Sequence, residues 1–221
     1  GFLNDLRRLD RARLDQTVKR FLALALPGEA ALPPPPQPAL MPDPDNRARF
    51  AARLESAGDD LVALMPGAAY GPAKCWPLEY FGDLAAGLTA VGARGVVLGS
   101  SVERPAGELI RRRGGDGIVN LCGETRLEDT VDILSLARAA VTNDSGLMHV
   151  TAAAGTHVVA IYGSTSPGFT PPLTDRKAIL SLELECSPCF ERECPLGHLR
   201  CLRDISVERV LGEVQSALDR R

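Results

Sequence analysis

The sequence predicts an α/β domain built on a Rossmann-like, doubly wound parallel sheet. Short runs of apolar residues alternate with longer stretches in which apolar residues recur at helical spacing. Apolar runs without polar alternation are typical of strands covered on both faces, as in parallel sheets. Right-handed crossovers between such strands place helices on both sides of the sheet.

The expected strands and helices all begin after residue 45. Strands are predicted at Leu61–Pro66, Gly95–Gly99, Ile118–Leu121, Ala139–Thr142 and Val158–Tyr162, with a sixth candidate at Ala178–Leu182. Helices are predicted at 46–57, 77–91, 103–113, 127–137, 146–154 and 206–219. Because ligands of such sheets bind beyond the carboxyl ends of the strands, a site is expected in the segments that follow them.

Two further segments precede this domain. Residues 1–26 place apolar side chains at helical spacing among charged ones, which predicts an amphipathic helical segment. Residues 27–44 are rich in proline, which removes backbone donors and fixes φ, so they predict an extended linker. The Rossmann-like domain then occupies residues 45–221, with a Cys-rich loop at 186–201.

The composition indicates a globular protein with a core. Hydrophobic residues make up 45% of the chain and charged residues 24%, and the net charge is −3. A dispersed, slightly acidic charge excludes a typical nucleic-acid-binding surface. The sequence shows no signal-peptide pattern and no apolar run long enough to span a bilayer, so we expect a cytoplasmic protein.

A lysine follows the first predicted strand. Lys74 lies in a loop with Gly67 and Gly71 and is the sole lysine between residues 20 and 176. A single ammonium at the ligand edge of the sheet suits a phosphate group, although a solvated loop lysine fits the pattern equally well. Trp76, in the same loop, is interpreted as a packing residue.

The fourth predicted strand leads directly into a helix. The backbone amides of Ser145, Gly146 and Leu147 would be unpaired at the positive end of that helix, which predicts an anion site. Asp144 fits either a helix cap or an acceptor for sugar hydroxyls. His149 can donate to an anion, but the spacing favours a structural histidine.

Two weaker candidates follow the second and third strands. Glu103 could accept hydrogen bonds from the hydroxyls of a ribose, or it could be a first-turn acid favoured by the helix dipole. Thr125 lies in the loop after the third strand, at the same edge of the sheet.

An acidic pair in the linker does not predict a metal site. Asp43-Pro44-Asp45 has the D-x-D pattern that binds metal in some glycosyltransferases, but no strand precedes it, and we interpret it as the start of a helix. Lys74 and helix amides would then neutralise a diphosphate, with no cofactor required for catalysis.

The Cys-rich loop contains four cysteines. Cys186, Cys189, Cys194 and Cys201 could hold a structural zinc ion, because the spacing of the first pair is typical of zinc knuckles. The remaining spacing differs from that of a zinc ribbon, so disulfides or free thiols stay open as alternatives.

Four motifs in order resemble the heptosyltransferases of glycosyltransferase family 9, and among them the lipopolysaccharide heptosyltransferase II group. They are PGAAYGPAKCWP, TNDSGLMHVTAAAG, YGSTSPGFTPPL and CSPCFERECPLGHLRC. The opening GFLNDLRRLD resembles the region that joins the two domains of that family. The resemblance implies that this chain is the C-terminal half of a GT-B fold.

The resemblance also implies an activity and its partners. The C-terminal domain of the family binds ADP-heptose, and the heptose passes with inversion to the lipid A–core oligosaccharide of lipopolysaccharide. That lipid-linked acceptor implies peripheral contact with the inner face of the inner membrane. Carried over by motif, Lys74 would hold the diphosphate and Asp144 the sugar hydroxyls, as the catalytic pair of this half. His149 would lie close to the helix amides, and Glu103 would bind the ribose.

The resemblance also identifies what this sequence does not contain. The proposed general base of the family is an aspartate in the N-terminal domain, so we expect donor binding with little or no transfer by this chain alone. The competing interpretation is a nucleotide-binding or interaction module without catalytic activity.

Overall fold

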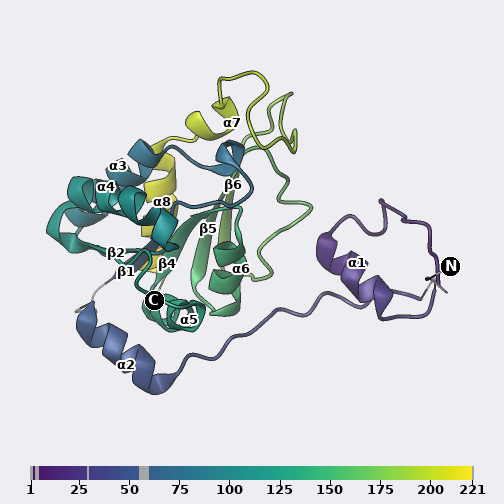
Figure 1. Ribbon diagram of the computed structural model, residues 1–221, viewed down its shortest axis with the longest axis horizontal. Helices are drawn as coiled ribbons and strands as arrows, with labels where there is room; N and C mark the ends of the chain where they lie inside the picture. The colour runs from purple at the N-terminus through teal and green to yellow at the C-terminus, as the bar shows by residue number, and fades with distance from the viewer. Residues whose placement is uncertain (1, 3–4, 29, 55–59, 221) are drawn as a thin grey trace.

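The computed structural model describes residues 2, 5–28, 30–54 and 60–220. Its centre is a six-stranded parallel sheet with the strand order β3-β2-β1-β4-β5-β6 (Figure 1). The strands are β1 (Leu61–Met65), β2 (Arg94–Val97), β3 (Ile118–Asn120), β4 (Ala139–Asn143), β5 (His157–Tyr162) and β6 (Lys177–Ser181). This order confirms the predicted doubly wound fold.

Helices cover both faces of the sheet. The α-helices are α1 (Thr17–Leu24), α2 (Pro44–Arg53), α3 (Leu78–Ala90), α4 (Arg104–Gly114), α5 (Leu127–Leu136), α6 (Gly146–Ala153), α7 (Arg200–Arg203) and α8 (Val207–Asp219). Short 3₁₀ turns are η1 (Pro72–Lys74), η2 (Ser101–Glu103) and η3 (Gly115–Gly117). One apolar core lies between the sheet and α3, α4 and α8, and a second lies under α2 and α5.

The strands form where the apolar runs predicted them. Every residue of β1, β4 and β5 is buried, as expected of strands covered on both faces. Asp43 caps α2, since its side chain accepts from the amides of Asp45 and Asn46, with Pro44 in the first turn. The D-x-D pattern is therefore a helix start, as predicted. The predicted helix 46–57 continues into residues 55–57, which lie outside the described residues.

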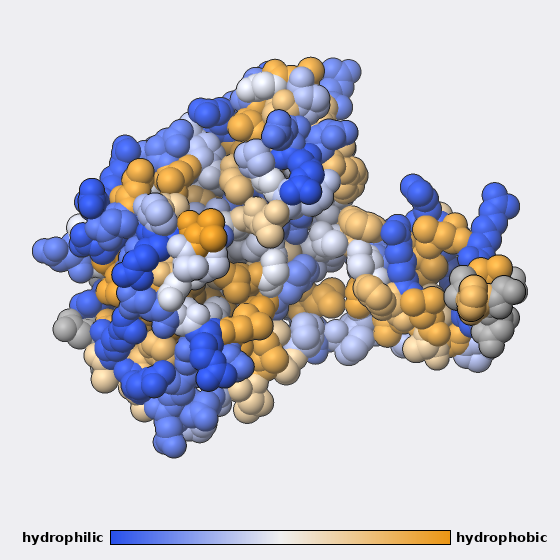
Figure 2. All heavy atoms as spheres, in the orientation of Figure 1, coloured by the Kyte–Doolittle hydropathy of each residue, from blue (hydrophilic) through white to orange (hydrophobic). Residues whose placement is uncertain are grey.

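The N-terminal segment departs from the prediction of a helix over residues 1–26. Among the described residues of that segment, only α1 is helical, and residues 5–16 carry no helix. The chain folds back instead, because Arg7 donates to the carbonyls of Ala23 and Leu26 at the end of α1. Residues 30–43 then run without helix or strand to α2, so that the α1 segment stands beside the main body (Figures 1 and 2).

Candidate nucleotide-sugar site

The strand order reverses between β1 and β4, and the loops after these strands diverge there. This switch point is where ligands bind in open α/β sheets. Two side-chain hydrogen bonds tie the diverging loops together. The side chain of Asn143 accepts from the amide of Trp76 at 2.9 Å and donates to the carbonyl of Pro66 at 2.7 Å. Trp76 itself is buried, and its indole donates to Ile205, which confirms its packing role.

The two strongest predicted residues meet at this point. The ammonium of Lys74 lies 2.7 Å from Oδ2 of Asp144, and the same oxygen accepts from the hydroxyl of Thr165 at 2.6 Å. The side chains of Lys74 and Asp144 are only 15% and 5% exposed. A pair this buried loses most of its Coulomb energy to desolvation, so fold stability alone does not explain it.

Helix α6 begins at Gly146, two residues after Asp144. Ser145 is its N-cap residue, with no side-chain hydrogen bond to the helix amides. The alternative in which Asp144 caps the helix is therefore wrong, because its carboxylate is bound to Lys74 and Thr165. The amides at the start of α6 have no partner within the helix and carry its positive end. A Cβ added to Gly146 would meet no atom within 4 Å, so a group can approach the backbone there.

A cavity of about 500 Å³ opens beside the start of α6. Its lining includes Glu103, Thr125, Ser145, Gly146 and Leu147. The structure thus brings the two weaker candidates to the same cavity as the helix amides. Neither Lys74 nor Asp144 lines this cavity, but Asp144 immediately precedes Ser145 in the chain and Lys74 contacts Asp144.

Glu103 takes the first-turn role that was one of its two predictions, and it also lines the cavity. Its Oε2 accepts from the amide and the hydroxyl of Ser100, at 2.6 and 2.8 Å, and so caps the turn that leads into α4. Its Oε1 lies directly above Gly67, where an added Cβ would come within 1.4 Å of it. The carboxylate is therefore held in place by the cap while it lines the cavity.

His149 lies apart from this cavity. It lines a smaller one, of about 240 Å³, with Val18 and Phe21 of α1 and Phe169. Burial of the imidazole lowers its pKa, the charge of Asp144 raises it and the charge of Lys74 lowers it. A lowered pKa makes His149 a neutral side chain at pH 7, within electrostatic reach of the ion pair.

Three residues near the ion pair were not singled out from the sequence. Thr165 anchors Asp144, and the ring of Tyr70 lies 5.0 Å from the ammonium of Lys74. The hydroxyl of Ser164 is buried and has no hydrogen-bond partner in the described part of the chain. The signal for Thr165 and Ser164 was their place after the fifth strand, which the topology sets beside the fourth.

The four cysteines of the Cys-rich loop lie between β6 and the end of α7. Cys186, Cys189 and Cys194 are half-buried, Cys201 is buried, and all are free thiols. Within the residues described, no three histidine, cysteine or carboxylate side chains are close enough together to hold a metal ion as they stand.

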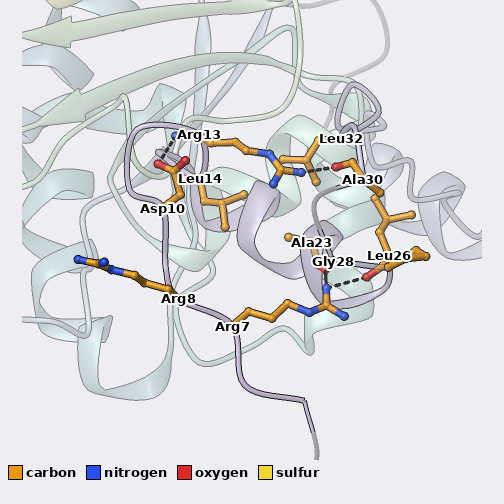
Figure 3. Close-up of a pocket in the computed structure, with 11 residues that line it drawn as sticks. Arg7, Arg8, Asp10, Arg13, Leu14, Ala23, Leu26, Gly28, Ala30 and Leu32 are labelled. Atoms are coloured by element: carbon orange, nitrogen blue, oxygen red, sulfur yellow. Dashed lines mark hydrogen bonds between the residues drawn. The ribbon is translucent and has the colours of Figure 1, made fainter.

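The α1 segment contains a separate cavity of about 370 Å³ (Figure 3). It is lined by arginines, but Arg7 and Arg13 donate to backbone carbonyls of the same segment. These arginines therefore hold the segment folded and are not free to bind an anion.

The comparison with known families agrees with this geometry. The model of glycosyltransferase family 9 (heptosyltransferase) matches residues 1–200. The chain belongs to this family. Lipopolysaccharide heptosyltransferase 2 of Salmonella typhimurium is 36% identical over 229 residues, which cover 99% of this chain and 66% of the relative. Lipooligosaccharide heptosyltransferase 2 of Haemophilus influenzae is 34% identical over 98% of this chain and 66% of its own length.

A solved structure of this family confirms the fold. The Escherichia coli ADP-heptose LPS heptosyltransferase II superposes with a TM-score of 0.84 at 33% identity, over 99% of this chain and 66% of that chain. The present chain thus spans 66% of the length of these glycosyltransferase family 9 relatives and corresponds to the expected half of a GT-B fold. None of the helices in the described ranges combines the length and apolarity needed to cross a membrane.

Proposed function

We propose that this chain is the donor-binding half of an inverting heptosyltransferase that transfers heptose from ADP-heptose to the lipopolysaccharide inner core. The observation that carries the proposal is the buried Lys74–Asp144 pair at the switch point, beside a helix N-terminus. A cation and a hydroxyl acceptor side by side match the two chemical groups that meet in a nucleotide sugar, the diphosphate and the sugar.

Each side chain would take one part of the donor. Lys74 would turn from Asp144 to the diphosphate, whose oxygens would also accept from the amides of Ser145, Gly146 and Leu147. The carboxylate of Asp144, still held by Thr165, would accept hydrogen bonds from the heptose hydroxyls. Glu103 and Thr125, across the cavity, would bind the nucleoside.

The same groups would assist the reaction. An acceptor hydroxyl attacks the anomeric carbon from the face opposite ADP, and the bond from that carbon to the phosphate oxygen breaks. The negative charge that develops on ADP is stabilised by Lys74 and by the helix amides, which are already oriented. We expect no metal cofactor for this step, and the general base is expected from the N-terminal domain of the family.

The acceptor places the reaction at a membrane. A lipid A–core acceptor would bring the protein to the inner face of the inner membrane from the cytoplasm, as a peripheral contact. The neighbouring domain, which is expected to bind that acceptor, would make this contact.

Calorimetric titration with ADP and ADP-heptose tests the proposal. Lys74→Ala removes a charge-assisted phosphate contact and should weaken both ligands by about 1.5–3 kcal/mol, roughly ten- to a hundredfold. Asp144→Asn should weaken ADP-heptose more than ADP. Lys177→Ala, which removes a lysine at the start of β6, is the matched control and should change neither affinity.

The outcomes separate the two candidate functions. Unchanged ADP affinity in Lys74→Ala would contradict the proposed site. Equal affinity of the wild-type chain for ADP and ADP-heptose, unaffected by Asp144→Asn, would instead favour a nucleotide-binding module without a role in sugar transfer.

A further inference from the structure

The middle of the Cys-rich loop lies against the loop that carries Lys74. The amide of Ala73 donates to the carbonyl of Arg192 at 3.1 Å, and the hydroxyl of Tyr70 donates to the carbonyl of Phe190 at 2.6 Å. Figure 1 shows the Cys-rich loop beyond the carboxyl ends of the strands, close to α7. These two hydrogen bonds therefore hold the backbone of Arg192 at the ligand edge of the sheet, next to the lysine loop.

The ring of Tyr70 lies close to two cations. The ammonium of Lys74 is 5.0 Å from the ring centroid, and the guanidinium carbon of Arg192 is 5.6 Å from it. A guanidinium that covers an aromatic ring with its face keeps the N–H donors at its edge available for a ligand. Tyr70 therefore brings a second cation to the lysine that is proposed to hold the diphosphate.

Arg192 differs from Lys74 in having no acidic partner. The ammonium of Lys74 lies 2.7 Å from the carboxylate of Asp144, so this pair carries no net charge. The side chain of Arg192 is exposed, and it forms no ion pair with any carboxylate of the described ranges. Glu191 and Glu193 flank it in the chain, but both are exposed and solvent screens their charges. Arg192 thus adds a positive charge that the buried pair does not supply.

We infer that Arg192 is a second cation of the donor site and binds the terminal phosphate of a nucleoside diphosphate. This inference rests on the proposed function. The cavity proposed for the nucleoside is lined by Glu103 and Thr125, whereas neither cation lines it. A phosphate chain that leaves this cavity past the amides of α6 meets Lys74 and Arg192 at its far end, where the terminal phosphate lies.

The chemistry of the two cations favours a diphosphate over a monophosphate. A planar guanidinium donates two parallel hydrogen bonds to one phosphate, while an ammonium acts as a point charge. Lys74 shares its charge with Asp144, and a diphosphate carries more than one negative charge. Both cations together therefore neutralise it better than Lys74 alone. Arg192 should be the source of much of the preference of this chain for a nucleoside diphosphate.

Calorimetric titration of the wild-type chain and of Arg192→Ala with ADP and AMP tests this role. Loss of a charge-assisted contact should weaken ADP binding about tenfold. AMP lacks the terminal phosphate, so its binding should weaken by less than about twofold. Added salt should weaken ADP binding less in the variant than in the wild-type chain, because one ionic contact is missing. Arg192→Lys keeps the charge and should bind ADP with an affinity between the two.

Arg112→Ala is the matched control. It removes an exposed arginine from the C-terminal end of α4, which runs back from the ligand edge of the sheet toward the start of β3. This variant should bind ADP and AMP as the wild-type chain does. Because Arg192 is exposed, Arg192→Ala should have the urea midpoint of the wild-type chain, which checks that the variant is folded.

The outcomes separate Arg192 from the donor site as a whole. Unchanged ADP affinity in Arg192→Ala, with weaker binding in Lys74→Ala, would overturn the role of Arg192 and leave the donor site standing. Equal losses of ADP and AMP affinity would overturn it too, because Arg192 would then act through the lysine loop and not on the terminal phosphate. A wild-type chain that binds no ADP would overturn the donor site itself, and the role of Arg192 with it.

Discussion

The site at the switch point and the Cys-rich loop lie at the same edge of the sheet but are built differently. Asp144 follows β4 directly and Lys74 lies in the loop after β1; both strands are fully buried, so the sheet itself fixes where the two loops begin. The Cys-rich loop has no such support, and its position comes from backbone contacts to the loops after β1 and β5. The buried strands fix the geometry of the switch-point site, whereas contacts with neighbouring loops fix the position of the Cys-rich loop.

This difference indicates where function and stability are coupled. The switch-point site contains a buried ion pair, and apolar side chains of similar size would stabilise the fold at least as well. The Cys-rich loop reaches it through Tyr70 and the backbone next to Gly71. A change at these contacts should therefore affect both regions, and a change in the ion pair should affect the core.

The largest effect is expected from breaking the ion pair on one side. Asp144→Ala leaves the ammonium of Lys74 mostly buried without its carboxylate, so the free energy of unfolding should fall by on the order of 3 kcal/mol. Urea denaturation measures this change. The double variant Lys74→Met with Asp144→Leu removes both charges and should lose much less. Equal losses in the single and double variants would show that the pair is not effectively buried.

A smaller effect is expected where the two regions touch. Gly71 has φ +156°, and an added Cβ would lie 2.5 Å from the backbone oxygen of Arg192. Gly71→Ala must therefore displace either the lysine loop or the Cys-rich loop, at a cost of about 1–3 kcal/mol. Gly92→Ala is the control, since Gly92 also has a positive φ, +79°, but open space around it. Equal destabilisation by the two variants in urea would mean that backbone strain alone accounts for the effect.

The hydrogen bond of Tyr70 should contribute less to the free energy of unfolding, because part of the Tyr70 side chain is exposed to solvent. Tyr70→Phe keeps the ring near Lys74 but removes the hydrogen bond to Phe190, which should cost about 1 kcal/mol in urea denaturation. Tyr80→Phe, at a ring in T-shaped contact with Trp76, is the matched control and should be nearly neutral. A loss in Tyr70→Phe no greater than that in the control would show that this contact does not join the two regions.

The sequence predicted the sheet because each strand contains a short apolar run, even where a polar residue begins or ends the strand, as Lys177 does in β6. It also predicted the site at the carboxyl edge, since Lys74 and Asp144 each follow such a run. Their direct pairing could not be predicted, because it depends on the strand order that sets β1 beside β4. The role of Thr165 depends in the same way on β5 lying next to β4.

The sequence was less informative where local propensity and tertiary contacts disagree. Residues 5–16 belong to the segment predicted to be helical but form no helix, because Arg7 donates to carbonyls at the end of α1 and folds the chain back. His149, in the first turn of α6, lines a cavity with α1 and not the cavity beside the helix amides, because the loop carrying Phe169 packs against α1. Nothing in the neighbouring sequence predicts the absence of a helix in residues 5–16 or the cavity that His149 lines.

The smallest expected effect concerns His149, whose pKa is affected by the charges of both Asp144 and Lys74. Its pKa lies below the ordinary value of 6.5, chiefly through burial, so the unfolded chain takes up the proton first as the pH falls. The native state therefore loses stability as the pH falls through and below 6.5, and this loss is absent above that range. His149→Gln should show a flatter dependence of the urea midpoint between pH 7.5 and 5.5. His157, whose pKa is also lowered by burial, should leave some dependence in the variant. An identical slope in the wild-type chain and the variant would mean that His149 titrates as freely in the folded chain as in the unfolded one.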